Sequence, residues 1–360
     1  MKSQTWAKCA LIIWLAIIFL TGFLVIIVDP YHHYHQPLNC FDYVAADAVY
    51  INDGICKNYD YDALITGTSM TSGFSEKEAS DLFHMTFLRA TFLGEGFKRI
   101  NENLESAIEH NPNLKFVIRS VDTLWFVSSS DWLAYENYPE YLYNDYLIDD
   151  TQYLYNLDMW LDVVIPTLKT FHLPTASSEI TFTELEQNQK DYLENEKALL
   201  NYNRPPKESE SVTSADNNEY FSYMDDNLYK NLLQVVEHNP EIEFYFYFPP
   251  YSILWWDSIN QAGDGRVNRR IDMEQYAIEK ILAYDNVKLF SFFNNFDLIC
   301  NLDNYSDEIH YHSDINSQIL TWMEAGEYEL TKENYLSYLS EIRNFYLNYN
   351  YNAIFEQQND

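Results

Sequence analysis

The stretch Asp62-Ala-Leu-Ile-Thr-Gly-Thr-Ser69-Met-Thr71 decides the fold of this chain. A short apolar run ends at Gly67, and a serine follows two residues later. Short apolar runs bounded by turn residues are typical of strands buried in a parallel sheet. Ligand sites in open α/β sheets lie outside the carboxyl ends of such strands. The stretch therefore predicts a buried strand that delivers Ser69 to the functional edge of a sheet.

Two further segments repeat a helix followed by a strand. Residues 103–119 and 231–247 each begin with an amphipathic helical pattern, stop at an Asn-Pro pair and continue into an apolar, β-rich run. Asparagine can adopt the left-handed cap that ends a helix, and proline cannot continue one. A helix followed by a buried strand is typical of βαβ units. The predicted strands are residues 62–66, 85–92, 116–121, 244–248 and 287–292. We expect an α/β fold, a flavodoxin-like three-layer sandwich with a five-strand parallel sheet, preceded by one transmembrane helix.

The amino-terminal segment has the properties of a membrane anchor. Residues 9–28 carry no charge and are almost all apolar, and about 20 such residues span a bilayer. Lys2 and Lys8 precede the segment, and cationic flanks stay cytoplasmic. A cleaved signal peptide is the rival interpretation, but no small-x-small cleavage site follows the apolar core. We expect a cytoplasmic tail (residues 1–8), a transmembrane signal-anchor (9–28) and one extracytoplasmic domain (29–360), which places the protein in the cell membrane as a single-pass chain.

Composition limits the partners of the extracytoplasmic part. The formal net charge is −33, from 22 basic and 55 acidic residues. Such a surface repels nucleic acid and attracts substrates that carry an amine. The 31 tyrosines could stack on sugar rings, although most tyrosines pack with a wet hydroxyl. Three cysteines lie outside the membrane segment, so one disulfide is possible but a disulfide framework is not expected.

A tyrosine-rich and acidic region interrupts the pattern of helices and strands. This insertion covers about residues 127–229. Within it, residues 203–218 have a polar composition that favours a mobile loop, whereas residues 138–147 and 153–168 are expected to cap one edge of the sheet. Near the carboxyl terminus, the spacing of Tyr335, Leu339 and Ile342 predicts an amphipathic helix that packs on the core. A helix that binds a partner is the alternative for this segment.

Three residue types needed for acyl transfer occur at suitable places. A serine hydroxyl is a weak nucleophile until a base removes its proton. His310 is the candidate base, and Asp307, three residues earlier, would orient and stabilise its imidazolium. Both follow the last predicted strand, so they and Ser69 can converge at the same sheet edge. Taken separately, a Gly-Thr-Ser turn and an Asp-x-x-His pair are weak signals, because capping aspartates and surface histidines are common.

The remaining chemistry is less specified. For the oxyanion hole we expect the amides of Ser69 and Met70, with Gly94 and Gly96 permitting a close backbone approach. His312 lies two residues after His310 and, with Asp307, raises the alternative of a metallohydrolase. Three ligands in one loop are weak support for a metal. We therefore expect neither a metal nor another cofactor.

These residues resemble the SGNH/GDSL hydrolase superfamily over residues 54–323, with the insertion unmatched. Its nucleophile block resembles Gly67-Thr-Ser69, its glycine block resembles Gly94 or Gly96, and its Asp-x-x-His block resembles Asp307 and His310. The sequences around Ser69 and His310 are most similar to the membrane-anchored extracytoplasmic branch, which includes the teichoic-acid D-alanylation protein DltD and acetylation proteins of exported polysaccharides. The resemblance implies a serine esterase or O-acyltransferase that acts on acetyl or D-alanyl esters of cell-surface polymers such as teichoic acid or exopolysaccharide.

One departure from the family pattern bears on activity. The superfamily carries a Gly-x-Asn-Asp block whose asparagine completes the oxyanion hole, but here the third predicted strand runs into Val121-Asp122-Thr. Either Asp122, backbone amides or a residue such as Asn52 would take that role, or activity is weak or lost. The alternative function is therefore a non-catalytic protein of this fold that binds glycans or acts as a scaffold for a membrane-bound acyltransferase. That acyltransferase is also the partner that the resemblance implies as the acyl donor.

Overall fold

The computed structural model describes residues 3–43, 47–135, 137–173, 197–209 and 214–356, and these form two compact units. The first unit comprises Met1–Asp60, Glu109–Asn111 and Glu136–Leu185. The second comprises Tyr61–Ile108, Pro112–Tyr135 and Glu186–Asp360, and it contains the sheet.

The sheet of the second unit has six strands, not the five that the sequence predicts. The strands are β1 (Ala63–Gly67), β2 (Phe87–Thr91), β3 (Phe116–Ser120), β4 (Glu243–Phe248), β5 (Val287–Ser291) and β6 (Glu329–Leu330), in the spatial order β2-β1-β3-β4-β5-β6. The first five are parallel and match the predicted segments within a few residues, and β6 is antiparallel to β5. A strand of two residues carries no periodic pattern, so β6 could not be predicted from the sequence.

The parallel strands form the core because both of their faces are covered. Every residue of β1 and β3 is buried, including Arg119 of β3, as expected for strands with both faces covered. Aromatic rings fill the layer beside the strands: Phe116 on β3 lies edge-on to Tyr245 on β4 with centroids 4.6 Å apart, and Phe83 contacts both rings.

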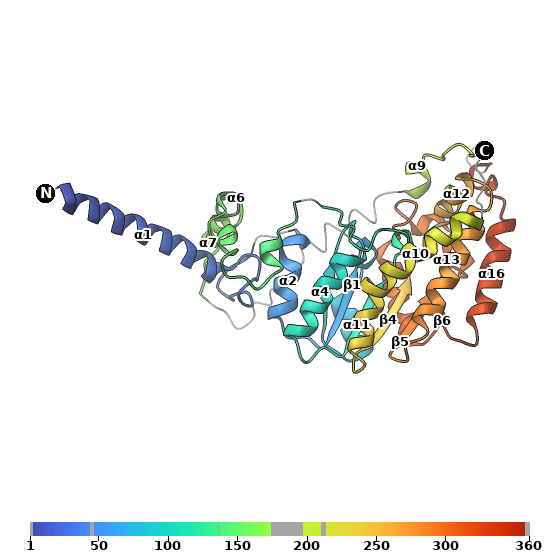
Figure 1. The fold of residues 1–360 in the computed structure, drawn as a ribbon, viewed down its shortest axis with the longest axis horizontal. Coiled ribbons are helices and arrows are strands. Elements are labelled where there is room, and N and C mark those ends of the chain that lie inside the picture. The colour runs from blue at the N-terminus through green and yellow to red at the C-terminus, as the bar shows by residue number, and fades with distance from the viewer. Residues whose placement is uncertain (1–2, 44–46, 136, 174–196, 210–213, 357–360) are drawn as a thin grey trace. The chain divides into compact units, whose positions relative to one another are not determined.

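Helices lie on both faces of this sheet. The chain passes from β1 through α3 to β2, and then back through α4 to β3 in the opposite direction. Because such crossovers are right-handed, α3 and α4 lie on opposite faces. Figure 1 shows α4, α11 and α13 together in front of the strands, while α3 contacts α15. The helices are α3 (Glu76–Phe83), α4 (Phe97–His110), α9 (Ala198–Asn201), α10 (Ser214–Leu228), α11 (Gln234–His238), α12 (Ile253–Gln261), α13 (Arg266–Ile281), α14 (Phe296–Cys300), α15 (Ser313–Glu324), α16 (Tyr335–Asn348) and α17 (Ala353–Glu356).

The predicted carboxyl-terminal helix packs on the core. In α16 the side chains of Tyr338, Leu339, Ile342 and Tyr346 are buried, and the helix lies against α13. Tyr346 stacks on Trp256 with ring centroids 3.8 Å apart. The packing interpretation of this segment is therefore confirmed.

The predicted mobile loop at residues 203–218 is wrong in part. Residues 210–213 lie outside the described residues, and residues 214–218 begin α10. Before them, Arg204 forms a two-pronged ion pair with Asp257, with Nε and Nη2 each 2.8 Å from a carboxylate oxygen. The carboxylate of Asp257 is fully buried, so burial and charge pairing anchor a segment that looked unstructured from its composition.

The first unit is helical and begins with the apolar segment. α1 (Ser3–Val28) is long and apolar enough to cross a membrane, and its orientation stays a prediction. The unit continues with α2 (Ala48–Asn58), η3 (Glu140–Leu142), α5 (Thr151–Leu154), α6 (Leu157–Met159), η4 (Trp160–Val164) and α7 (Ile165–Lys169). The segments predicted to cap the sheet thus belong to the compact unit that contains α1.

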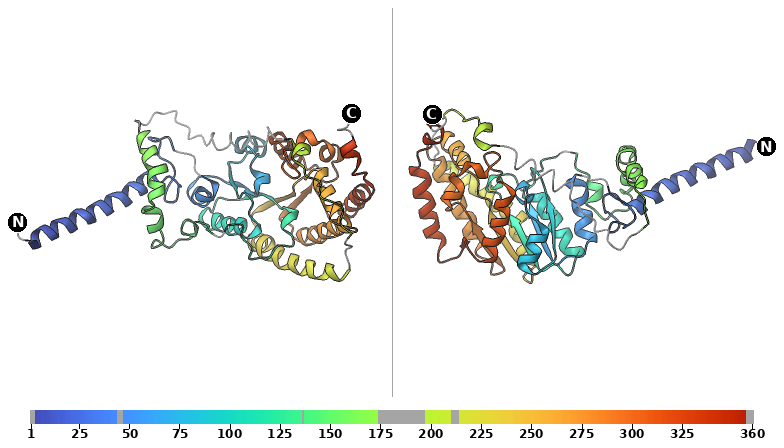
Figure 2. Two further views of the ribbon diagram at one scale, coloured as in Figure 1. Left: turned by 90° about the horizontal axis from the view of Figure 1, so that it is seen from above. Right: turned by 180° about the vertical axis from the view of Figure 1, so that it is seen from behind.

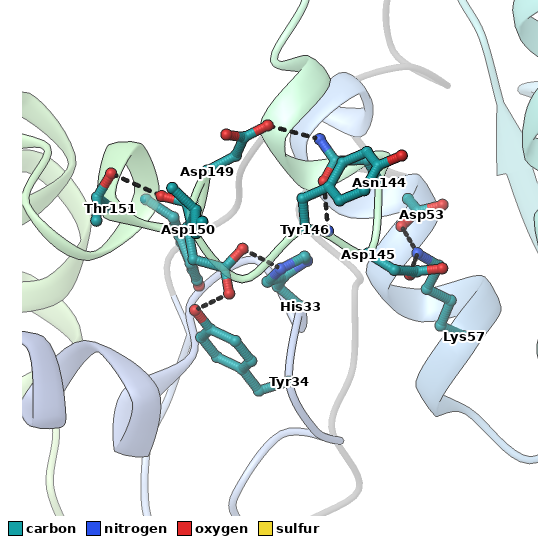
Figure 3. A network of polar contacts seen from close by, with 12 residues as sticks. His33, Tyr34, Asp53, Lys57, Asn144, Asp145, Tyr146, Asp149, Asp150 and Thr151 are labelled. Atoms are coloured by element: carbon teal, nitrogen blue, oxygen red, sulfur yellow. Dashed lines mark hydrogen bonds and ion pairs between the residues drawn. The ribbon is translucent and has the colours of Figure 1, made fainter.

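Polar contacts tie the parts of the first unit together (Figure 3). Lys57 on α2 pairs with Asp53 at 3.0 Å and with Asp145 at 2.9 Å. Asp150, just before α5, accepts a hydrogen bond from the Tyr34 hydroxyl at 3.0 Å and lies 3.4 Å from His33 Nε2. All four cysteines are free thiols, so the possible disulfide is not formed.

Candidate active site

The turn after β1 requires a glycine at its first position. Gly67 has φ +152°, and a Cβ atom there would lie 2.1 Å from Ser120 Oγ and 2.8 Å from Thr71 Cγ2. Strands β1 and β3 are neighbours in the sheet. After β1 the chain continues to β2 on one side, and after β3 it continues to β4 on the other side. Ligand sites in open α/β sheets form between two such strands, at their carboxyl ends. The absence of a side chain at Gly67 lets the two strand ends approach closely.

A buried carboxylate holds the residue before the nucleophile. Asp122, which follows β3, accepts hydrogen bonds from the hydroxyls of Thr68 and Ser120, each at 2.9 Å, and from Tyr251 at 2.8 Å. Ser120 Oγ in turn accepts the backbone N–H of Thr68 at 3.2 Å. Burial raises the pKa of Asp122, while the hydrogen bonds from the three hydroxyls and the nearby His310 oppose this shift. Thr68 is thus fixed through both its backbone and its side chain.

The residue after the nucleophile is held by its carbonyl. Ser69 begins the short helix η1 (Ser69–Thr71). The carbonyl oxygen of Met70 accepts hydrogen bonds from Asn316 Nδ2 at 3.0 Å, from the Tyr311 hydroxyl at 3.1 Å and from the Tyr247 hydroxyl at 3.4 Å. These donors come from α15, from the loop before it and from β4. The Ser69 peptide is therefore fixed on both sides by buried polar contacts.

The Asp-x-x-His loop forms its own compact structure. An antiparallel bridge between Tyr305 and Tyr311 closes the loop, and Ser306 N–H donates to the His310 carbonyl at 2.9 Å. Inside it, Asp307 Oδ1 accepts the backbone N–H groups of Ile309 at 2.9 Å and His310 at 2.8 Å. Aspartate side chains commonly close turns in this way, which explains the three-residue spacing in the sequence.

The structure brings Ser69, His310 and Asp307 together in one chain of hydrogen bonds. Ser69 Oγ lies 2.8 Å from His310 Nε2, and His310 Nδ1 lies 2.6 Å from Asp307 Oδ2. Burial acts to raise the pKa of Asp307, but the hydrogen bonds from the His310 ring and from two backbone amides outweigh it, so this pKa is lowered. Asp307 is therefore ionised at neutral pH. The order of groups is the one that general-base activation of a serine needs.

The amides around Ser69 remain the candidate oxyanion donors. Because Ser69 is the first residue of η1, its amide has no partner inside that helix. The Met70 amide points to Thr68 Oγ1 at a long 3.3 Å. Gly94 and Gly96 lie in the loop that follows β2. Phe92, the first residue of this loop, donates its N–H to the Gly67 carbonyl at 2.8 Å. The loop with both glycines thus begins beside the nucleophile turn, and its role in the site stays a prediction.

The contacts of Asp122 answer one question that the missing asparagine left open. Asp122 faces inward as an acceptor for three hydroxyls, so it supports the nucleophile turn rather than presenting a donor to an oxyanion. Asn52 belongs to the first compact unit, and its role stays a prediction. No group of three or more metal-binding side chains occurs in the described part of the chain, and His312 occupies the N-cap position of α15 without a side-chain cap hydrogen bond.

Sequence reasoning missed most of the groups that hold the site. The donors to Met70 and the contacts of Thr68 join segments far apart in the chain, and tyrosines or asparagines at those positions carry no local signal.

No family model, curated protein or solved structure matches the chain.

Proposed function

We propose that this chain is a membrane-anchored serine esterase or O-acyltransferase with Ser69 as the nucleophile, His310 as the general base and Asp307 as the group that orients it. The observation that carries the proposal is the hydrogen-bonded series from Ser69 Oγ through the imidazole to the Asp307 carboxylate. The fixed peptide on either side of Ser69 supports it, because a nucleophile must be held in place before it can attack.

The steps follow from the positions of the atoms. Ser69 Oγ attacks the ester carbonyl while its proton passes to His310 Nε2, and the ionised Asp307 stabilises the imidazolium. The oxyanion that forms is held by the amides of Ser69 and Met70. When the intermediate collapses, the leaving alcohol takes the proton from Nε2 and the acyl group stays on Ser69. Water or an acceptor hydroxyl then attacks this ester and gives its proton to Nε2. The bond between the acyl carbon and Ser69 Oγ breaks as Oγ takes the proton back from Nε2, which regenerates the serine.

The substrate class comes from the resemblance and from charge. The acidic surface suits an acyl group with a cationic amine, such as a D-alanyl ester, and permits an acetyl ester. The acceptor or donor is then a cell-surface polymer or glycan, such as teichoic acid or an exopolysaccharide. A membrane-bound acyltransferase would supply the acyl group outside the cell, with the domain after α1 extracytoplasmic. The order of the five parallel strands, 2-1-3-4-5, is the flavodoxin-like order and supports assignment to the SGNH/GDSL fold.

A second candidate is a non-catalytic scaffold or glycan-binding protein of the same fold. The specific observation in its favour is the buried acceptor Asp122 at the place where the superfamily has an oxyanion donor. The two functions differ in their need for the Ser69 hydroxyl: catalysis requires it, whereas a scaffold does not.

A fluorophosphonate probe separates the two candidates. In this reaction the activated serine oxygen attacks phosphorus and fluoride leaves, so labelling reports the nucleophile without knowledge of the natural substrate. We expect the full-length chain in detergent to be labelled at Ser69, as located by peptide mass mapping, and we expect no label in Ser69→Ala or His310→Ala.

The matched control is His312→Ala, because His312 lies on the same loop but outside the hydrogen-bonded series. This variant should label like the wild type, and a chelator should have no effect. An unlabelled wild type that is folded would refute autonomous catalysis and favour the scaffold. Loss of labelling on addition of a chelator would favour a metallohydrolase.

A further inference from the structure

One helical segment of the first unit runs across α1. Residues 157–169 form a nearly continuous helix made of α6, η4 and α7, with α5 immediately before it. Figure 2 shows this segment, in green, crossing α1 near the end of the blue helix. α5 contacts α1, and the Tyr155 hydroxyl donates to the Ile18 carbonyl at 3.3 Å. A Cβ atom at Gly22 would lie 2.9 Å from the same hydroxyl, so the ring rests directly on α1.

Buried contacts fix the start of this segment to the end of α1. Asp29, the residue after α1, accepts the Tyr153 hydroxyl at 2.8 Å and the N–H groups of His33, Tyr34 and His35. Tyr153 lies within α5 and is fully buried. Together with the contacts of Asp150 in Figure 3, these bonds join α5 to the membrane helix. The position of the segment along α1 is therefore a built feature of the unit.

The contact lies well inside the apolar span. Ile18 precedes Val28 by ten residues and Gly22 precedes it by six. With a rise of 1.5 Å per residue, the tip of the Tyr155 side chain reaches α1 about 9–15 Å before its end, in the half of a hydrocarbon core of about 30 Å that is nearer to Asp29. With α1 in the bilayer, the neighbouring segment cannot remain in bulk water. Its hydroxyl bond to a backbone carbonyl also satisfies a polar group that would otherwise face lipid.

The segment carries exposed apolar side chains on one side and exposed acidic side chains beside them. Leu157 is 68% exposed and Leu161 55% exposed, and they lie one helical turn apart on the same face. The adjacent Asp158 and Asp162 line an open surface pocket of about 530 Å³ whose walls also include Tyr31. The exposed large apolar side chains around α5 are Tyr146, Leu147, Ile148, Tyr155, Leu157 and Leu161. This is the two-sided pattern of helices that lie in a membrane interface.

We propose that the segment from α5 to α7 is a second membrane contact, lying in the interface of the leaflet that α1 leaves at Asp29, with Leu157 and Leu161 among the lipid chains. The occupant of this surface is lipid, because the surface continues the apolar side of α1 and is fixed to it. Since the polar face is acidic, insertion is driven by apolar burial and not by attraction to anionic headgroups. The inference goes beyond the proposed reaction and holds whether or not Ser69 is active.

Spin-label accessibility in the reconstituted full-length chain tests the proposal. The exposed or half-exposed Cys9, Cys40 and Cys300 are replaced by serine, while Cys56 is buried and stays. Nitroxides are then placed at Leu157→Cys or Leu161→Cys in neutral phosphatidylcholine vesicles. We expect collisions with oxygen to rise and collisions with water-soluble nickel chelate to fall relative to a label at Leu336→Cys, an exposed leucine on α16. A label at Asp158→Cys should show less contact with oxygen, because Asp158 lies on the acidic side of the segment, which we expect to face the headgroups and water.

Three results would overturn the proposal. Water-like accessibility at 157 and 161, equal to that at 336, would place the segment outside the membrane. Protection of both positions from oxygen and from nickel chelate would indicate a protein partner instead of lipid. Membrane-like values that appear only when anionic lipid is added would show that headgroup charge, and not apolar burial, holds the segment.

Discussion

Gly67→Ala tests how the nucleophile turn is built. An added Cβ would lie 2.1 Å from Ser120 Oγ, whereas ordinary contacts begin at 3.4 Å, so the hydroxyl has to move by about 1.3 Å. That movement removes the acceptor of the Thr68 backbone N–H and loosens the bond to Asp122. The change therefore acts on the residue just before Ser69 without touching the reacting groups.

The cost has two parts. A buried N–H left without a partner costs about 1–3 kcal/mol. Alanine at the φ of +152° adds about 1–3 kcal/mol of backbone strain. We therefore expect a loss of about 3 kcal/mol in the free energy of unfolding, which lowers the thermal midpoint of a domain of this size by roughly 6–12 °C. Fluorophosphonate labelling of Ser69 should slow as well.

Gly94→Ala is the matched control. Gly94 also has a positive φ of +70°, but a Cβ there would meet only the Tyr135 hydroxyl at 3.7 Å. Only the backbone cost of about 1 kcal/mol remains. Ser120→Ala already removes the acceptor of the Thr68 amide, so the double variant with Gly67→Ala should lose about 1–3 kcal/mol less than the sum of the single losses. A loss for Gly67→Ala no larger than for Gly94→Ala, or full additivity with Ser120→Ala, would refute the reasoning.

Three further predictions concern charge. Asp307→Asn keeps the shape of the side chain but removes the charge beside His310 Nδ1. The rate of fluorophosphonate labelling should therefore fall by about 10²–10⁴-fold. An unchanged rate would exclude the role of Asp307 in orienting and stabilising the imidazolium. Burial raises the pKa of Glu274 to about 7, so the wild type loses stability as pH rises through 7. Glu274→Gln should therefore have the higher thermal midpoint at pH 8 and no advantage below pH 4.5; equal differences at both pH values would contradict this. Arg204→Ala leaves the buried Asp257 carboxylate without its cation, so the free energy of unfolding, measured in urea, should fall by about 3 kcal/mol. Arg204→Lys should recover only part of this loss, because lysine lacks the forked donors of arginine. Full recovery by lysine would show that geometry does not matter here.

The sequence predicted those parts of the structure that local pattern determines. The five parallel strands were found because their residues are mostly apolar and follow turn or helix-stop signals, and the pairing of Asp307 with His310 followed from a spacing that one turn can satisfy. Their meeting with Ser69 was predictable because parallel strands share one carboxyl edge.

The remaining parts depend on contacts between distant segments. Tyr251 and Asn316 look like ordinary polar residues until the fold places them beside Asp122 and Met70. The polar stretch around Arg204 resembles a loop because composition does not reveal the buried partner Asp257. In each case, long-range polar pairing determined the structure where local propensity gave no answer.

The short strand β6 has a consequence for the behaviour of the chain at a crowded surface. A parallel sheet that ended at β5 would offer a row of unpaired N–H and C=O groups to any extended segment that came near. The two residues of β6 run in the opposite direction and occupy part of that edge, with Glu329 opposite Phe290. A strand so short is itself a poor template for another strand, and its carboxylate repels an acidic neighbour of the same kind. The β5 side of the sheet thus carries its own protection against edge-to-edge aggregation, independent of any chemistry at Ser69.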